Sequence, residues 1–479
     1  DLTVNPNYEH INQDPSEINN TPYETYKEEK RPFFLENEIF FKTPIEIFYS
    51  RRVGGIVNTN FNYSSSNLDQ YDYFLSDLKS AIKYTGKSNE RSYGLILSYS
   101  EPSSLRNFIN PSNTYASIFR FSQKFQNNHI GFIATNNSKG KNISNVYGID
   151  CSMNLINNQL YIDSQVAFSD INTKIGTGYN FKIGYQSNLL SMLDKSLVVD
   201  FWLRRDAYDT DFHISDLGYL FRNNLKETNI GFSINDVQGI TKSTFTLQYE
   251  QSKNYSDDIL SDIISFKYNI LMQNLSFLNI GLSLESEHFA DRFNDYFLNL
   301  DINKIIKVPN YKTINFGYGN DLRNDFSYEI LIEKFTNDLD DKGVGYNLGL
   351  IYQLNNWMDI SFSYNKLNYD ETYHFLKIRQ LPGGINSFSS YNDDYRVRYE
   401  YLFTNSINKE TYYTAQISAY LDKIVLQIYS EYFIYENDWS QNGKFYKIGE
   451  DNDDYIYPIS TTSNEDYDGD KILYNAYYT

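Results

Sequence analysis

The feature of this sequence that most constrains its fold is a two-residue alternation of apolar and polar side chains, which recurs from about residue 77 onwards. Successive side chains of a β-strand point to opposite faces, so the alternation predicts strands with one apolar face and one mostly polar face. In residues 196–205 the two faces are Leu197, Val199, Phe201 and Leu203 against Val198, Asp200, Trp202 and Arg204.

The same pattern recurs in about twenty segments of roughly 8 to 11 residues, a length that suits a tilted strand crossing a lipid bilayer. Four of the expected strands are residues 357–367, 372–379, 395–403 and 411–421, and a last one is expected at 471–478. Short connections, such as the one around Asn127, alternate with longer polar connections, such as residues 206–227 and 286–310. Outer-membrane β-barrels show this asymmetry of turns and loops. No apolar run reaches the ~18 residues of a membrane-spanning helix, so a membrane-spanning form of the chain would be a closed barrel.

We therefore expect an all-β protein, a transmembrane antiparallel β-barrel of about 18 to 22 strands. The high content of Tyr (46 residues) and Phe (33 residues) agrees with pleated, half-buried surfaces. A soluble β-sandwich would also alternate, but its strands are usually shorter and its apolar faces pack against a second sheet. The two architectures differ in what the apolar faces contact.

The charge balance and the single cysteine limit the partners of the chain. It has 42 basic and 61 acidic residues, a net charge of −19. Binding of a polyanion needs a basic face, so we expect no nucleic-acid partner. Cys151 is the only cysteine and shares the apolar face of its segment with Ile149 and Met153. We expect no disulfide, no metal site and no cofactor.

No catalytic signature stands out, and we expect the protein not to be an enzyme. The five histidines are isolated, and there is no H-E-x-x-H pair, no G-x-S-x-G turn and no phosphate-binding loop. The alternative is a glycan-active enzyme on a barrel scaffold, with groups such as His213 and the neighbouring Asp211 at its rim. Loop aromatics such as Tyr435 and Trp439 favour glycans as a further partner.

Residues 28–54 depart from the alternation, because they mix charge clusters with dense aromatics and keep neither a helical nor a strand period. We divide the chain into a leader (residues 1–76), acting as a plug or periplasmic cap, and an outer-membrane β-barrel (residues 77–479). A barrel of this width cannot be filled by its own side chains, so part of the leader is expected to enter or cap it.

The arginines of the leader are expected to pair with acidic residues on the inward face of the strands, because the fork of Arg suits carboxylates. The alternative is a leader that packs under the rim with its arginines in solvent. The candidate plug and lumen residues are Glu28, Glu29, Arg31, Arg51, Arg52, Asp200, Glu250, Glu329 and Glu333.

Four segments resemble parts of the DUF5916 family: DLTVNPNYEHINQDPSEINNTPYETYKEEKRPFFLENEIFF (1–41), IFYSRRVGG (47–55), SAIKYTGKS (80–88) and FHISDLGYLFRNN (212–224). The resemblance extends over nearly the whole chain. It implies an outer-membrane barrel of a Gram-negative bacterium and supplies no established activity. Members often carry an upstream domain similar to family 9 carbohydrate-binding modules, which is not part of this sequence, and the chain is expected to stop short of the family's final strand or strands.

We expect a function in transport or secretion, or as a membrane subunit of a larger assembly. The expected partners are outer-membrane lipid, other outer-membrane or periplasmic proteins, and glycans. The alternative within the same fold is a filled, non-conducting barrel with a structural role, whose loops dock partner proteins.

Overall fold

The computed structural model describes residues 1–6, 23–54, 56–58, 73–102, 112–187, 190–192, 195–236, 241–292, 305–338, 341–380, 399–421, 424–438, 446–448 and 455–456. Strands make up 71% of it, mostly in one antiparallel sheet, and there is almost no helix. The prediction of an all-β protein is confirmed. Among the residues described, no helix is long and apolar enough to cross a membrane.

The chain divides into two compact units. Unit 1 contains Asp1–Asn188, Asp200–Gly231 and Glu250–Ile259, and unit 2 contains Leu189–Val199, Phe232–Tyr249 and Leu260–Thr479.

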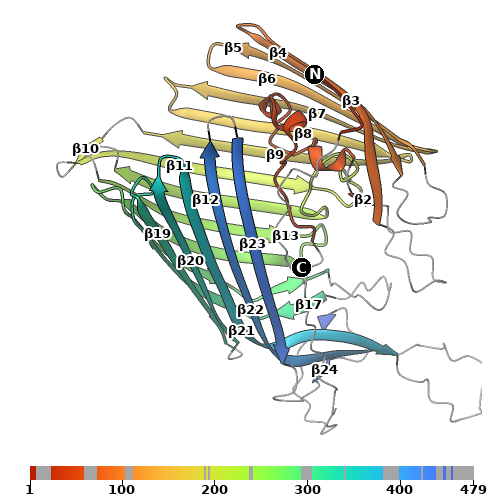
Figure 1. The fold of residues 1–479 in the computed structure, drawn as a ribbon. Helices are drawn as coiled ribbons and strands as arrows, with labels where there is room; N and C mark the ends of the chain where they lie inside the picture. Colours follow the sequence, from red (N-terminus) through yellow and green to blue (C-terminus); the bar gives the residue numbers. More distant parts are fainter. Residues whose placement is uncertain are drawn as a thin grey trace, which may run out of the picture. The chain divides into compact units, whose positions relative to one another are not determined.

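Unit 1 is built on antiparallel strands, each of which pairs with its neighbour in the chain (Figure 1). The last strand of the series pairs with the part of β11 that follows Val199. These strands are β3 (Tyr73–Lys87), β4 (Arg91–Pro102), β5 (Thr114–Phe125), β6 (Asn128–Lys139), β7 (Asn142–Leu155), β8 (Leu160–Ile171), β9 (Lys174–Gln186) and β11 (Lys195–Tyr208).

The leader contributes two short strands and three single turns of helix to unit 1. The strands β1 (Leu2–Val4) and β2 (Ile56–Asn58) both pair with β3, and β1 lies on the edge that does not face β4. Between them lie α1 (Pro32–Leu35), η1 (Glu38–Phe40) and η2 (Ser50–Arg52). Proline at the first position suits the start of α1, because that position needs no backbone N–H donor.

Unit 2 continues the same architecture. Its strands pair in the order β14, β15, β18, β19, β20, β21, β22 and β23, all antiparallel. Their bounds are β14 (Ile259–Leu271), β15 (Phe277–Glu285), β18 (Tyr311–Gly319), β19 (Phe326–Asn337), β20 (Lys342–Asn355), β21 (Met358–Gln380), β22 (Tyr399–Leu421) and β23 (Ile424–Asp438).

Shorter strands complete the described structure. β24 (Tyr446–Ile448) pairs with β22, and β10 (Leu190–Met192) pairs with the start of β11. A separate small sheet is formed by β16 (His288–Ala290), β17 (Ile305–Val308) and β25 (Tyr455–Ile456). The remaining two strands are β12 (Leu225–Asp236) and β13 (Lys242–Lys253).

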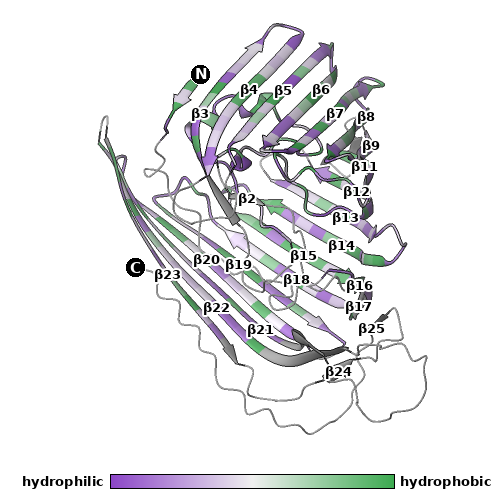
Figure 2. Cartoon of the chain, turned by 90° about the vertical axis from the view of Figure 1, so that its right-hand side faces the viewer, coloured by the Kyte–Doolittle hydropathy of each residue, from purple (hydrophilic) through white to green (hydrophobic). Residues whose placement is uncertain are grey.

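Apolar and polar residues alternate along these strands, as the green and purple bands of Figure 2 show. In β7, Ile149 is 59% exposed while its neighbour Asp150 is only 2% exposed. The apolar face of the unit 1 sheet is therefore the exposed face, and its polar face is the buried one. This is the reverse of a water-soluble sheet, which buries its apolar face.

Two of the expected strand boundaries were wrong. The sequence predicts separate strands at 357–367 and 372–379, and at 395–403 and 411–421, but β21 and β22 each run unbroken for 23 residues. The pairing between β21 and β22 has register shifts between Glu371 and His374 and between Phe375 and Lys377, and both strands continue through them. The expected strand at 471–478 lies outside the described residues.

The sheet is not closed within the part of the chain that the structure describes. A closed barrel would use the second edge of β3, and β1 occupies part of that edge. The coarse prediction of a large antiparallel sheet is confirmed, whereas a closed barrel is not observed.

Candidate functional site

The candidate site is the contact between the leader and the polar face of the unit 1 sheet (Figure 1). Aromatic side chains of the leader form an apolar layer there, with Phe34 and Phe41 each 3% exposed. They pack in one cluster with Ile96 of β4 and Ile118 of β5. The few apolar residues on this otherwise polar face lie where the leader covers it.

The centre of the leader contacts the sheet at two points. One is a hydrogen bond to a glutamine side chain, and the other is an isoleucine packed closely against a glycine. Gln165 of β8, which is 1% exposed, accepts a hydrogen bond from the backbone N–H of Ile45 at 2.6 Å. Ile47 is fully buried, and a Cβ at Gly148 of β7 would lie 2.5 Å from its Cδ1. A side chain at Gly148 would therefore push the leader away from the sheet.

Lys83 of β3 attaches the first helical turn. Its side chain is 1% exposed, and its ammonium donates to the backbone carbonyl of Phe33 and, at 2.7 Å, to that of Glu36. Those carbonyls belong to the C-terminal end of α1, where a positive charge is favoured. The Asp1 carboxylate lies 3.3 Å from the ammonium. A buried charge of this kind is stabilised only by such partners.

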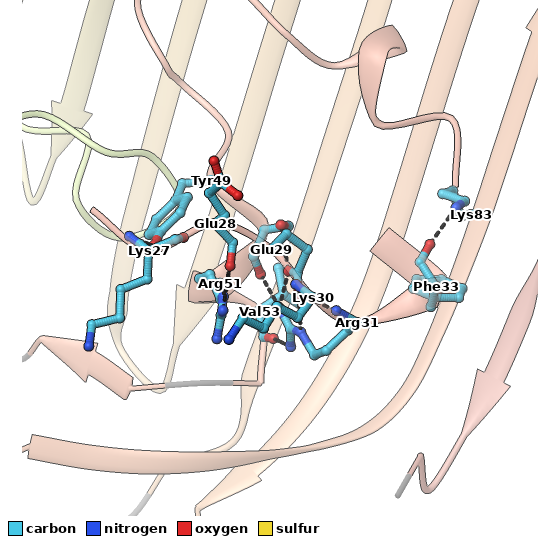
Figure 3. Close-up of polar contacts among 11 residues, drawn as sticks. Lys27, Glu28, Glu29, Lys30, Arg31, Phe33, Tyr49, Arg51, Val53 and Lys83 are labelled. Carbon is cyan, nitrogen blue, oxygen red and sulfur yellow. Dashed lines mark hydrogen bonds and ion pairs between the residues drawn. The ribbon is translucent and has the colours of Figure 1, made fainter. Parts of the chain in front are cut away.

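Inside the leader, Glu29 and Arg31 form a buried ion pair that joins three of its segments (Figure 3). Arg31 donates to Glu29 through Nε at 2.9 Å and through Nη2 at 2.7 Å, and also to the carbonyls of Val53 and Ser50. The Ser50 hydroxyl donates to Glu29 at 2.6 Å. Burial by itself would raise the pKa of Glu29, but the bonds from Arg31 outweigh burial and hold that pKa below its ordinary value.

The other two arginines also bind within the leader. Arg51 donates through Nε to the carbonyl of Glu28 at 2.8 Å (Figure 3). Arg52, which is 6% exposed, forms an ion pair with Glu24. The alternative of solvated arginines does not describe Arg31 or Arg52, because both are buried.

The loop between β11 and β12 lies beside the leader on the same sheet face, where the backbone N–H of His213 donates to the hydroxyl of Ser169 of β8. The backbone N–H of Tyr49 donates to the carbonyl of Leu217 at 2.7 Å, and that of Tyr219 donates to the carbonyl of Glu46 at 2.9 Å. This two-way exchange is a strand-like pairing between segments far apart in the chain. The FHISDLGYLFRNN segment (212–224) therefore packs on the sheet and pairs with the edge of the leader.

Beneath the leader, the sheet contains its own buried ion pair. Arg120 of β5 reaches over Gly131 of β6 to Asp150 of β7 and binds both carboxylate oxygens, one of them at 2.8 Å. A Cβ at Gly131 would lie 2.4 Å from Nη1 of Arg120, so only glycine leaves room for this bridge. The two side chains are 6% and 2% exposed.

Two of the four acids predicted on the strands are found with other partners. Asp200 accepts from the Tyr161 hydroxyl at 3.1 Å, and Glu250 accepts from Nδ2 of Asn229 at 3.1 Å. Glu329 and Glu333 are on β19, in unit 2. The ion pairs of Arg31 and Arg52 given above are made inside the leader, and pairing of leader arginines with the strand acids stays a prediction.

The sequence reasoning missed Lys83, Gln165 and the Arg120–Asp150 pair. The signal was present, because each of these polar groups occupies the inward position of an alternating strand. A charged residue at such a position needs a buried partner. The identity of that partner could not be read from the alternation.

Two of the histidines lie near polar side chains. No group of three or more His, Cys, Asp or Glu residues within the described structure could hold a metal ion. The side chain of Asn223 lies 3.4 Å from the ring nitrogens of His213, and Nδ1 of His288 lies 3.5 Å from Glu285. Trp439, named above as a possible glycan contact, lies outside the described residues.

These features define a class of protein that consists mainly of a large antiparallel sheet with an exposed apolar face. In unit 1 an N-terminal segment packs on the polar face of that sheet. The chain belongs to the DUF5916 family, a domain of unknown function, whose family model matches residues 1–427. That match confirms the resemblance carried by the leader and by residues 212–224. A search of curated proteins found no match.

Proposed function

We propose that the protein is an outer-membrane β-barrel of a Gram-negative bacterium that acts in transport or secretion, or as a membrane subunit of a larger assembly. In this proposal the strands form the barrel wall and the leader plugs or caps part of its interior. Outer-membrane lipid is the first partner, and other outer-membrane or periplasmic proteins are further partners.

One observation carries the proposal: the apolar face of the alternating strands is the exposed one. Large apolar side chains are exposed on the strands of both units, such as Tyr84 (59%) and Ile149 (59%) in unit 1 and Ile428 (68%) in unit 2. In water an apolar surface of this extent would aggregate or bind a partner. A membrane barrel places this face against lipid and its polar face towards the interior.

The packing of the leader supports the plug. It covers the face that would line the interior of a barrel, and it is attached there by Lys83, Gln165 and the 212–224 loop. A wide barrel either conducts or is filled, so a segment packed on the inner wall narrows any channel. The same packing favours the second candidate function, a filled structural barrel that does not conduct.

Two measurements test the proposal. Membranes of an expressing Gram-negative host are first washed with alkaline carbonate, and the protein is expected to stay in the outer-membrane fraction. Release into the aqueous wash would overturn the membrane assignment.

Purified protein is then inserted into planar lipid bilayers to record single-channel currents. If the protein is a transport channel, discrete conductance steps are expected. The steps should be larger in Lys83→Met, because this variant loosens the leader. They should be unchanged in the control Lys87→Met, because the side chain of Lys87 is exposed. Absence of current in all three proteins would favour the filled barrel and exclude a conducting channel.

A further inference from the structure

The polar face of unit 2 carries a groove with a volume of about 520 Å³. Two neighbouring rows of residues, running across β15, β18, β19, β20, β21 and β22, account for most of its lining. The first row is Asn279, Gly317, Leu331, Asn347, Asn365 and Tyr412. The second row is Gly281, Asn315, Glu333, Gly345, Leu367 and Glu410, of which all but Gly281 line the groove.

The groove is elongated, because each row continues across six strands. Neighbouring strands lie about 4.8 Å apart, so the rows extend over about 24 Å. Residues opposite each other in an antiparallel pair share one face of the sheet, which puts both rows on the same side. The shape suits a linear ligand that lies across the strands better than a compact one.

The side chains of the groove combine amides, carboxylates and an aromatic wall. Four asparagines supply both donors and acceptors, and Glu333 and Glu410 supply acceptors. Tyr412 stacks on Phe433 of β23 with ring centroids 4.4 Å apart, which forms a wall at one end. Such a wall packs well against the C–H groups of a flat, partly apolar ring.

Part of this hydrogen-bonding capacity is unused. Within the described residues, the side chains of Asn279, Asn315 and Glu333 have no hydrogen-bond partner. Asn347, by contrast, donates to Asn365 across the strand pair. Polar groups that converge on a groove without partners of their own are available to a polar ligand.

The charge of the groove argues against an anionic ligand. Lys366 is the only basic residue among the lining residues, and it is paired in register with Tyr346, on the opposite face from the two rows. The rows themselves contain two carboxylates and no cation. An anion would face repulsion with no compensating partner, whereas a ligand rich in hydroxyl groups can donate to the carboxylates and exchange hydrogen bonds with the amides.

We infer that this groove binds a linear, neutral oligosaccharide. The hydroxyl groups of the ligand bond to the asparagines and to Glu333, and one sugar ring packs on Tyr412. This inference deepens the proposed function, because it names the solute or glycan that an outer-membrane barrel would recognise. Binding itself does not require transport, so the two can fail separately.

The chain offers a matched pair of variants on one strand. Gly345 and Gly349 both lie on β20 and on the same face, but only Gly345 lines the groove. A Cβ at Gly345 would meet Cδ1 of Leu367 at 3.6 Å, and a Cβ at Gly349 would meet Cβ of Glu329 at 4.0 Å. Both are ordinary contacts, so a Cβ is accommodated at either position, and the side chain of valine narrows the groove only at residue 345.

The experiment is isothermal titration calorimetry of the detergent-solubilised full chain with maltohexaose. Wild type is expected to bind, Gly345→Val to lose at least tenfold in affinity, and Gly349→Val to stay within twofold of wild type. Glu333→Gln, at an exposed position, is expected to weaken binding about tenfold and provides a second readout if Gly345→Val fails to fold.

An anionic chain of similar length separates the ligand classes. A galacturonate hexamer is titrated beside maltohexaose and is expected to bind at least tenfold more weakly, because the two rows of the groove contain two carboxylates and no cation. Tighter binding of the galacturonate hexamer, no binding of either hexamer, or equal affinity of the two valine variants for maltohexaose would overturn the inference. Conductance and membrane extraction are measured separately, so loss of sugar binding leaves those results intact.

Discussion

The polar sheet faces of the two units are built from the same alternation but are covered differently. In unit 1 the leader and the 212–224 loop bury the polar face, so that Gln165 and Asp150 are 1% and 2% exposed. In unit 2 the corresponding face carries an open groove with Asn315 and Glu333 in its wall. The alternation therefore determines which face is polar, while other segments of the chain determine whether that face is filled.

The largest expected effect comes from breaking the ion pair beneath the leader. Arg120→Met leaves the Asp150 carboxylate buried without its partner, and this should lower the free energy of unfolding by about 3–5 kcal/mol. Urea unfolding in detergent, followed by tryptophan fluorescence, measures the change. The control is Arg91→Met. The hydrogen bond from Arg91 to Gln123 is exposed, so its loss should lower the free energy of unfolding by less than about 0.5 kcal/mol. Equal effects of the two variants would show that the buried pair does not stabilise the wall.

The next test removes the apolar anchor of the leader. Ile47→Ala deletes a fully buried side chain and should destabilise the leader by about 2–5 kcal/mol, through lost burial and the cavity it leaves. Limited proteolysis should cut residues 23–54 sooner than in wild type. Ile39→Ala changes a side chain that is 74% exposed and should leave the cleavage rate unchanged. A leader cut equally fast in both variants would contradict its packing on the sheet.

A smaller effect is expected from the single polar contact in the same place. Gln165→Met keeps the approximate volume but removes the acceptor for the backbone N–H of Ile45, at a cost of about 1–3 kcal/mol. The same proteolysis measures it, with the exposed Gln123→Met as the matched control. If cleavage of the Gln165 variant follows that of the control, the bond to Ile45 does not help to hold the leader.

The smallest expected effect is the pH dependence of the Glu29–Arg31 pair, which lies within the leader. The pKa of Glu29 is lowered in the folded protein from an ordinary 4.5, so the pair stabilises the leader above that pH. The stabilisation is lost as pH falls through the lowered pKa. Acid-active protease should therefore cut the leader faster below pH 4.5.

Two variants check the source of that pH dependence. Glu29→Gln should be cut faster at neutral pH and should show a weaker response to acid than wild type. Glu38→Gln removes an exposed pair with Lys42 and should keep the wild-type profile. An unchanged acid response in Glu29→Gln would assign the effect to another carboxylate.

Much of the fold could be predicted because the two-residue period is a local property of each strand. The period assigned the residues of β7 to the correct faces, because Ile149 is exposed and the neighbouring Asp150 is buried. It failed at β21, where the polar residues around Asp370 resemble a turn although the strand continues through them. Strand continuity there depends on pairing with β22, which is far away in the sequence.

The leader shows the same limit. Its aromatic and charged composition indicated a segment that packs against the strands, but not which groups would meet. Arg31 pairs with Glu29, two residues away in the chain, and the buried Asp150 of β7 pairs with Arg120. An argument from complementary charges alone does not show which of several acids an arginine binds.

The central claim is that the apolar strand face contacts lipid. Spin labels on β18 test this claim directly. Each label is placed singly, at residue 313, 314, 315 or 316 in a Cys151→Ala background, and the labelled protein is reconstituted in bilayers. The measurement is how often the label collides with oxygen and with a water-soluble nickel complex. Labels replacing Ile314 and Phe316, which are 55% and 43% exposed, should collide mainly with oxygen, and labels replacing Thr313 and Asn315 mainly with nickel. Labels at 314 and 316 that are shielded from both reagents, or that prefer nickel, would contradict the account.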